Sequence, residues 1–237
     1  TCDVPVHHYG KLPTDRNKRK ADVYYLLGRK KLEETGNTPA ALRELAVQAA
    51  EMGKYEEAVA HWQEFVKLVP GGALPFFNMA TIYMEMGLHP EALRAATRAR
   101  EIDPDSKETA LTYATASICN ANPREAIAVL EELLHRVPVY PPAEVCLAAA
   151  YCTAGKTEEG TALLRKLLEK GYNYYPALNA LSRKLISSRK GSLALSLLEP
   201  MHEILPSDGT TAALMDECAQ SLSHRASRNH APGPPPG

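Results

Sequence analysis

The chain has 237 residues, of which 45% are apolar and 23% are charged, as in an ordinary globular protein. Its 27 Lys and Arg residues are balanced by 28 Asp and Glu residues, and this balance argues against nucleic-acid binding, which normally needs a basic excess. No stretch approaches the ~20 uninterrupted apolar residues that a membrane-spanning helix requires.

The first 38 residues predict a flexible segment followed by a helix. Residues 1–13 lack a regular apolar pattern, whereas residues 14–38 begin with a helix start at Pro13-Thr14-Asp15 and continue with an apolar stripe. We therefore expect an N-terminal helix before the main body of the chain.

Residues 39–206 repeat with a period of 34, which predicts five units at 39–72, 73–106, 107–140, 141–174 and 175–206. One column of small residues is Ala58, Ala92, Ala126, Gly160 and Ala194, and a second is Ala46, Ala80, Ala114, Ala148 and Ser182. A third column is Pro70, Pro104, Pro138, Tyr172 and Pro206.

Each column has a physical reason in a pair of antiparallel helices. Small residues allow two helices to cross closely, because the side chains at the contact set the distance between the axes. Proline ends the second helix, since it cannot continue the backbone hydrogen bonds. Gly53, Gly87 and Gly155 predict the end of the first helix, and Asn120-Ala121-Asn122-Pro123 predicts the same turn through Asn and Pro.

This pattern resembles the tetratricopeptide repeat (TPR) family. The resemblance implies an all-α fold, a right-handed α-solenoid of stacked helix-turn-helix hairpins. The fourth repeat departs most from the family pattern, through Gly160 and Tyr172, so its boundary with the fifth is expected to be distorted. Residues 207–223 predict a capping helix that covers the last hairpin, and residues 224–237 predict a disordered Pro-rich tail.

Sequence motifs for catalysis are absent. The chain lacks phosphate-binding loops, dinucleotide-binding turns, nucleophile elbows and zinc-binding helices. Acidic pairs such as Glu56-Glu57 fall on outward helix faces, where solvation is the simplest interpretation. We therefore predict a protein that is not an enzyme and has no cofactor.

The resemblance implies that the first helix of each repeat lines a concave groove for a peptide or a protein segment. Exposed apolar residues there would indicate a ligand, whereas tight curvature of the solenoid could instead bury them against one another. The groove residues that it implies are Arg43, Val47, Leu74, Phe77, Asn78, Thr81, Met84, Leu111, Thr112, Thr115, Ile118, Val145, Ala149 and Arg183.

The N-terminal segment allows three interpretations. Cys2 resembles the acylated cysteine of bacterial lipoproteins, several of which are TPR proteins of secretion and pilus systems, although Thr1 is a poor fit to the residue that precedes it. Cys2, Asp3, His7 and His8 are also metal-ligand types, but nothing in the segment fixes their geometry. An ordinary chain boundary is the third interpretation.

The function predicted from these patterns is a non-enzymatic adaptor whose groove binds a peptide or subunit segment during assembly of a larger complex. A bacterial envelope secretion or pilus machine is one such complex. A self-associating scaffold is the alternative, and a metal-binding protein is the less favoured one. The compartment stays open between an anchored periplasmic or outer-membrane location and the cytoplasm.

Overall fold

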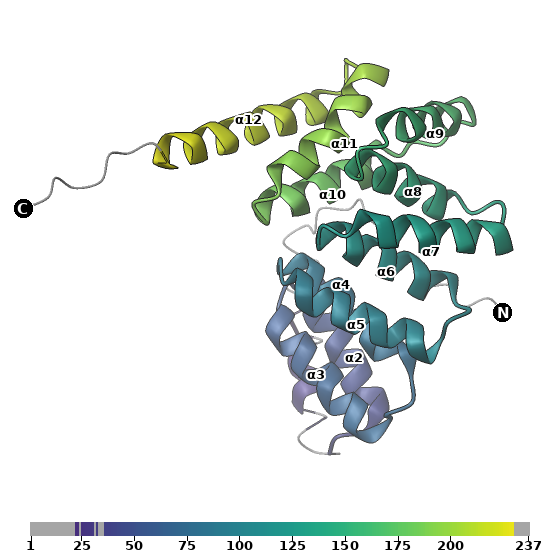
Figure 1. The fold of residues 1–237 in the computed structure, drawn as a ribbon. Helices are drawn as coiled ribbons and strands as arrows, with labels where there is room; N and C mark the ends of the chain where they lie inside the picture. Colours follow the sequence, from purple (N-terminus) through teal and green to yellow (C-terminus); the bar gives the residue numbers. More distant parts are fainter. Residues whose placement is uncertain (1–21, 24, 31, 33–35, 230–237) are drawn as a thin grey trace, which may run out of the picture. The chain divides into compact units, whose positions relative to one another are not determined.

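The computed structural model describes residues 22–23, 25–30, 32 and 36–229, and every regular element in these ranges is a helix (Figure 1). Ten helices form five consecutive hairpins, and one further helix follows. Their bounds are α2 (Pro39–Glu51), α3 (Tyr55–Leu68), α4 (Ala73–Glu85), α5 (His89–Ile102), α6 (Lys107–Cys119), α7 (Pro123–Arg136), α8 (Pro141–Thr153), α9 (Thr157–Glu169), α10 (Tyr175–Ser187), α11 (Gly191–Ile204) and α12 (Gly209–Asn229).

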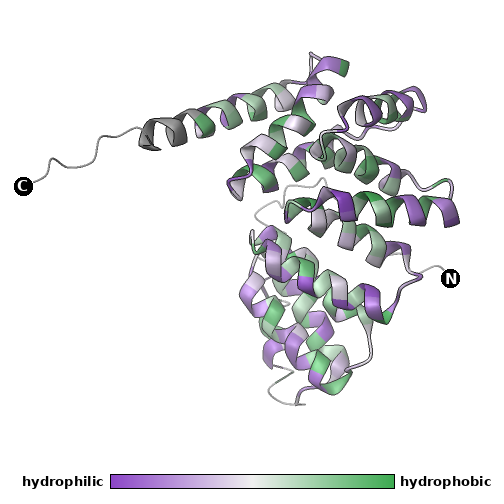
Figure 2. Cartoon of the chain, in the orientation of Figure 1, coloured by the Kyte–Doolittle hydropathy of each residue, from purple (hydrophilic) through white to green (hydrophobic). Residues whose placement is uncertain are grey.

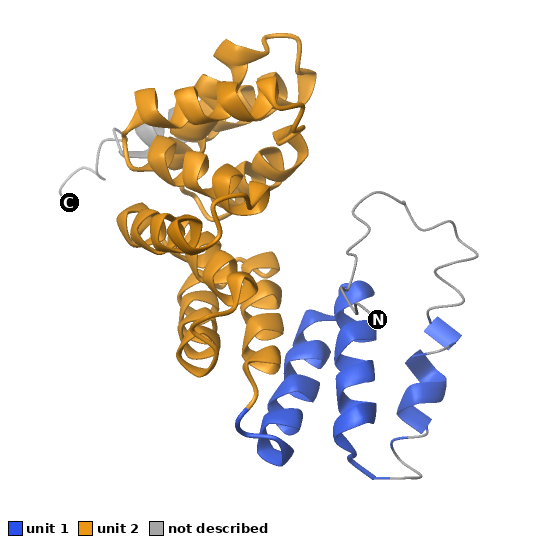
Figure 3. Ribbon diagram, turned by 90° about the vertical axis from the view of Figure 1, so that its right-hand side faces the viewer, with its two compact units in different colours: residues 1–71 blue, residues 72–237 orange. Residues whose placement is uncertain are grey.

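The chain divides into two compact units, Thr1–Gly71 and Gly72–Gly237 (Figure 3). Unit 1 contains the first hairpin and the helical residues before it. There Tyr25 is buried and donates a hydrogen bond of 2.6 Å to the Glu57 carboxylate. The helix predicted for residues 14–38 ends earlier, because Gly36 adopts a left-handed φ of 76° and residues 36–38 are not helical. Residues 14–21 lie outside the described residues.

The small residues that define the repeat are all buried, which explains why their size recurs. All five residues of the first column and all five of the second are buried, and large apolar residues of the second helices, such as Trp62, Leu130 and Leu198, are at most 1% exposed. Most helices carry apolar residues on one side and polar residues on the other, whereas α6 and α8 are buried over most of their surface (Figure 2). Burial of apolar residues therefore holds each helix in its hairpin.

One left-handed residue ends the first helix in every hairpin. Gly53, Gly87, Ala121, Gly155 and Arg189 stand 34 residues apart and have φ values of 73°, 74°, 65°, 81° and 59°. In each hairpin the residue directly after the left-handed one donates its N–H back to a carbonyl in the last turn of the helix, which satisfies one of the last carbonyl groups. In the third hairpin the left-handed residue is Ala121 itself, not one of the asparagines beside it.

Ala121→Gly is expected to stabilise the protein by about 0.5–1 kcal/mol, because a left-handed φ strains a residue that has a Cβ atom. Ala121 is exposed, so the change removes little packing. Urea unfolding followed by circular dichroism measures the effect. Ala128→Gly, at an exposed position inside α7, is the matched control and should destabilise the protein by a similar amount.

Within unit 2 the hairpins stack regularly until the fifth. The second helix of one hairpin packs on the first helix of the next, α5 on α6 and α7 on α8, and the first helices α4, α6 and α8 pack in a row. The fifth hairpin breaks this order, because α11 forms the main contact with α8 and α9, while α10 packs on α6, α11 and α12. The regular order of the first four hairpins therefore changes at the boundary between the fourth and fifth repeats, where the sequence indicated a distortion.

The break coincides with the weakest part of the repeat pattern. Residues 170–174 connect α9 to α10, one residue more than the connections 103–106 and 137–140 before it. Tyr172 stands where the other repeats have Pro, and Gly171 adopts a left-handed φ of 82°. The change in packing order thus coincides with a longer connection that lacks the proline of the other repeats.

Helix α12 packs on α10 and α11 and buries Leu214 and Cys218. The Asp208 carboxylate caps its first turn by accepting a hydrogen bond of 2.8 Å from the Thr211 N–H. The sequence predicted that this helix ends at residue 223, whereas it continues to Asn229. No Gly or Pro interrupts the chain before Pro232, so nothing stops the helix at residue 223. Residues 230–237 of the predicted tail lie outside the described residues.

Candidate functional site

The candidate site is the surface of unit 2 formed by the row of first helices α4, α6 and α8. At the second residue of each repeat, Leu74, Glu108 and Pro142 are all exposed. These residues form the N-terminal edge of the surface.

One turn further along the helices lies the open row, which we define as Phe77, Leu111 and Val145. These three apolar side chains stand at equivalent repeat positions and are only half-buried. Thr81 and Thr115 follow on the next turn, and their hydroxyls donate to the Phe77 and Leu111 carbonyls at 3.2 Å and 2.9 Å. The hydroxyls are thus bonded within their own helices, which leaves this part of the surface largely apolar.

The C-terminal half of the same surface is closed. Met84 is 7% exposed, and Ile118 and Ala149 are 0% exposed. The expectation that Met84 and Ile118 are exposed groove residues is therefore wrong, and the alternative of burial applies to them. Thr112 is likewise buried, and Asn78 is half-buried with its side-chain amide bonded to the Leu74 carbonyl at 2.9 Å.

Charged residues lie along the N-terminal edge of this surface. The Lys107 ammonium lies 5.1 Å from the centre of the Tyr140 ring. Burial, followed by the charge of Glu108, raises the pKa of Tyr140, so its hydroxyl stays neutral and can donate hydrogen bonds. The open row therefore has a polar border on one side.

The predicted ends of the groove belong to different parts of the chain. Arg43 and Val47 are exposed on α2 of unit 1 and are described with that unit alone. Arg183 is exposed on α10. Its neighbour Asn179 is buried and donates to the Asp208 carboxylate at 3.2 Å, so this asparagine is part of the joint with α12.

The clasp, a group of three polar contacts, joins the end of α10 and the turn after it to the second and third hairpins. The Lys184 ammonium pairs with the Glu85 carboxylate at 2.5 Å, the Ser188 hydroxyl bonds to the His89 ring, and the Lys190 ammonium donates to the Cys119 carbonyl. Nothing in the sequence indicated these contacts, because Glu85 and Lys184 are 99 residues apart. Burial, followed by the charges of Lys190 and Lys184, lowers the pKa of His89.

The cysteine thiols of the described residues are unsuited to nucleophilic chemistry. Burial raises the pKa of Cys119 to about 12, that of Cys146 to about 11 and that of Cys152 to about 12. Thiolate is therefore scarce at neutral pH. Within the described ranges no three His, Cys, Asp or Glu side chains gather as a metal site would require, and Cys2, His7 and His8 lie outside them. No described helix is both long and apolar enough to span a membrane.

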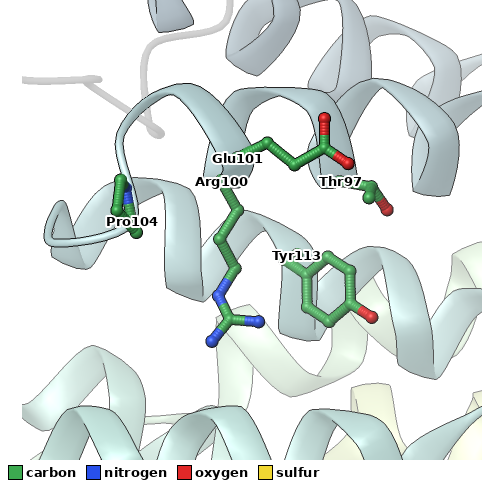
Figure 4. A pocket seen from close by; sticks show the side chains of 5 residues that line it. All are labelled: Thr97, Arg100, Glu101, Pro104 and Tyr113. Atoms are coloured by element: carbon green, nitrogen blue, oxygen red, sulfur yellow. The ribbon is translucent and has the colours of Figure 1, made fainter.

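A shallow hollow lies between α5 and α6, where the second and third hairpins meet (Figure 4). The Arg100 guanidinium lies 5.4 Å from the centre of the Tyr113 ring and pairs with Glu132 at 3.1 Å. The remaining lining residues are Thr97, Glu101 and Pro104.

These features define an α-solenoid of helical hairpins with an apolar surface on its first helices. A tetratricopeptide-repeat family model matches residues 40–72. The first hairpin thus matches the TPR family by sequence, and the remaining hairpins share the TPR fold. No curated protein matches the chain by sequence.

Solved TPR structures share the fold at low sequence identity. A tetratricopeptide repeat protein from Parabacteroides merdae has a TM-score of 0.62 at 14% identity, over 86% of this chain and 80% of its own. YrrB, a TPR protein described as having an unusual peptide-binding site, gives 0.55 at 14% identity over 78% and 96%. PilW, described as a type IV pilus biogenesis factor, gives 0.53 at 18% identity over 81% and 94%. The TPR fold is typical of protein-interaction scaffolds.

Proposed function

We propose that this chain is a non-enzymatic adaptor that binds an apolar peptide or subunit segment along the open row of unit 2. The observation that carries the proposal is the partial exposure of Phe77, Leu111 and Val145 at equivalent positions of three consecutive hairpins. Apolar side chains that recur in a line at a surface are favoured where a partner covers them.

The spacing of the open row suggests the form of the ligand. Neighbouring packed helices have axes about 8–10 Å apart, and an extended chain rises about 3.3 Å per residue. Every third residue of an extended segment would therefore reach the next member of the row. A suitable probe is a 12-residue peptide with Leu at every third position and Ser or Gly between, compared with a scrambled peptide of the same composition.

Leu111→Arg is expected to weaken binding of this probe about 100-fold, because it places a charge in the middle of an apolar contact. Leu111 is half-buried at the surface of α6, so the variant should still fold. Fluorescence anisotropy with labelled peptide gives the dissociation constant, and circular dichroism confirms that helicity is retained.

The matched control is Leu168→Arg, which places the same charge at an exposed Leu on the second helix α9. It should bind the probe as the unchanged protein does. Equal binding by Leu111→Arg and Leu168→Arg would move the site away from the open row. A self-associating scaffold would instead give a molar mass that rises with concentration in light scattering.

The narrower role in an envelope secretion or pilus machine rests on Cys2 and stays a proposal. PilW shares the fold, and at 18% identity this likeness carries the fold alone. The mass of the protein isolated from its source tests the anchor, since an unmodified Cys2 would exclude a lipoprotein.

A further inference from the structure

The clasp joins hairpins that are not neighbours in the repeat order. Each repeat of a regular solenoid contacts only the repeats next to it. Here the fifth hairpin has its helix α11 packed on the fourth, while its turn reaches Glu85 and His89 of the second and Cys119 of the third. Unit 2 is thus closed at the end where the turns of these hairpins meet.

The three contacts differ in chemistry but act between the same segments. An ion pair, a hydrogen bond between His89 and Ser188, and an ammonium at the C-terminal end of α6 all join the second and third hairpins to residues 184–190. The last contact is favourable because the C-terminus of a helix carries partial negative charge. Each contact is individually weak near the surface, so the clasp can open reversibly.

The closed half of the candidate site lies beside these contacts. Ile118 is 0% exposed and directly precedes Cys119, whose carbonyl accepts the bond from Lys190, and α10 packs on the same helix α6. Met84 directly precedes Glu85, the partner of Lys184. The clasp and the burial of these two apolar residues therefore occur at the same helix ends.

We propose that the clasp is a built-in gate, which closes the C-terminal half of the peptide surface and must be released before a longer apolar segment can reach Met84 and Ile118. This inference rests on the proposed function. A segment that needs only the open row binds with the clasp shut, whereas a longer segment binds a state in which residues 184–190 have moved away.

The gate is also sensitive to acid. His89 is buried at the start of α5, with Lys184, Lys190 and Glu85 around it and only Ser188 as the hydrogen-bond partner of its ring. A protonated His89 ring would lie near two ammonium groups and a helix N-terminus, and their positive charge disfavours protonation. Because the closed form holds His89 below its ordinary pKa of 6.5, closure is fully favoured above pH 6.5 and weakens as the pH falls below it.

A first experiment tests the clasp without any ligand. Lys184→Glu places two carboxylates together, and hydrogen exchange by mass spectrometry should then be about fivefold faster in residues 111–120 and 184–191. Adding Glu85→Lys should restore slow exchange, because the pair is re-formed with its charges reversed. Lys166→Glu on the outer helix α9 is the control. Equal exchange in Lys184→Glu and Lys166→Glu, or no restoration in the double variant, would overturn the proposal.

A second experiment locks the gate. A Cβ atom at Gly87 would lie 4.0 Å from the Ser188 hydroxyl, so Gly87→Cys with Ser188→Cys, in a Cys2→Ser background, places two thiols within bonding reach. The oxidised protein should bind an 18-residue version of the Leu-containing peptide about tenfold more weakly than the reduced protein, since only the open state accepts it. The 12-residue peptide should bind both forms equally.

The outcomes separate the two proposals. If both peptides bind equally to the oxidised and reduced forms, the gate is wrong and the adaptor function stands. If neither peptide binds any form, the adaptor function is wrong, and the exchange experiment alone decides whether the clasp closes unit 2. The single variants Gly87→Cys and Ser188→Cys control for strain at the left-handed residue 87.

Discussion

Ile118→Arg is expected to destabilise unit 2 strongly and to hold the gate open. Ile118 is 0% exposed near the end of α6, so an arginine there must bury a charge without a partner or force α6 and α10 apart. We expect a loss of about 2–4 kcal/mol of unfolding free energy, because opening the gate exposes residue 118 before the whole unit unfolds. Urea unfolding followed by circular dichroism measures it.

Two further substitutions calibrate this result. Ile118→Val should cost about 1 kcal/mol and Ile118→Ala about 2–5 kcal/mol, as expected for shortening a buried side chain. Leu111→Arg lies two turns earlier on the same helix but is half-exposed, so it should cost less than 1 kcal/mol, about the usual effect of a surface substitution. If Ile118→Arg were as stable as Leu111→Arg, the C-terminal half of the surface would be open in solution.

The contrast between Ile118 and Leu111 shows what the sequence could predict. Both stand at repeat positions that face the concave side in the TPR family, and the repeat could not distinguish them. The 34-residue columns predicted the hairpins because each column reports a local contact between one helix and its neighbour. Whether a first helix is open to solvent depends instead on where the fifth hairpin packs, which the columns do not predict.

The fifth hairpin departs from the regular packing although its sequence differs little from the repeat pattern. The connection before it is one residue longer than the earlier ones, and Tyr172 replaces a proline. Those signals indicated a distortion but not its direction. The fifth hairpin contacts the second through Lys184 and Glu85, and nothing in the sequence distinguishes these two residues from the other Lys and Glu residues.

The second large prediction concerns Gly160→Ala, for which the family pattern and the structure predict opposite effects on stability. The other four repeats have Ala at this position, and Ala is favoured over Gly inside a helix by about 1 kcal/mol. The repeat alone therefore predicts that Gly160→Ala stabilises the protein. A Cβ atom at Gly160, however, would lie 2.4 Å from the Cys152 sulfur and 3.1 Å from the Ala148 carbonyl oxygen.

That overlap should exceed the gain in helix propensity. Overpacking a close-packed interior costs about 1–3 kcal/mol, and the contact with the Ala148 carbonyl involves backbone, which cannot rotate away. We expect Gly160→Ala to lower the midpoint of thermal unfolding of unit 2 by several degrees. Differential scanning calorimetry of the full chain measures the shift.

A double-mutant cycle identifies the cause of that loss. Cys152→Ala removes the sulfur that lies 2.4 Å from the added Cβ, so the Gly160→Ala, Cys152→Ala protein should be more stable than the sum of the two single changes predicts. Strictly additive effects would show that α8 and α9 separate to admit the methyl group. In that case glycine at this position would not be required by the close approach of the two helices, and its departure from the repeat would have no packing reason.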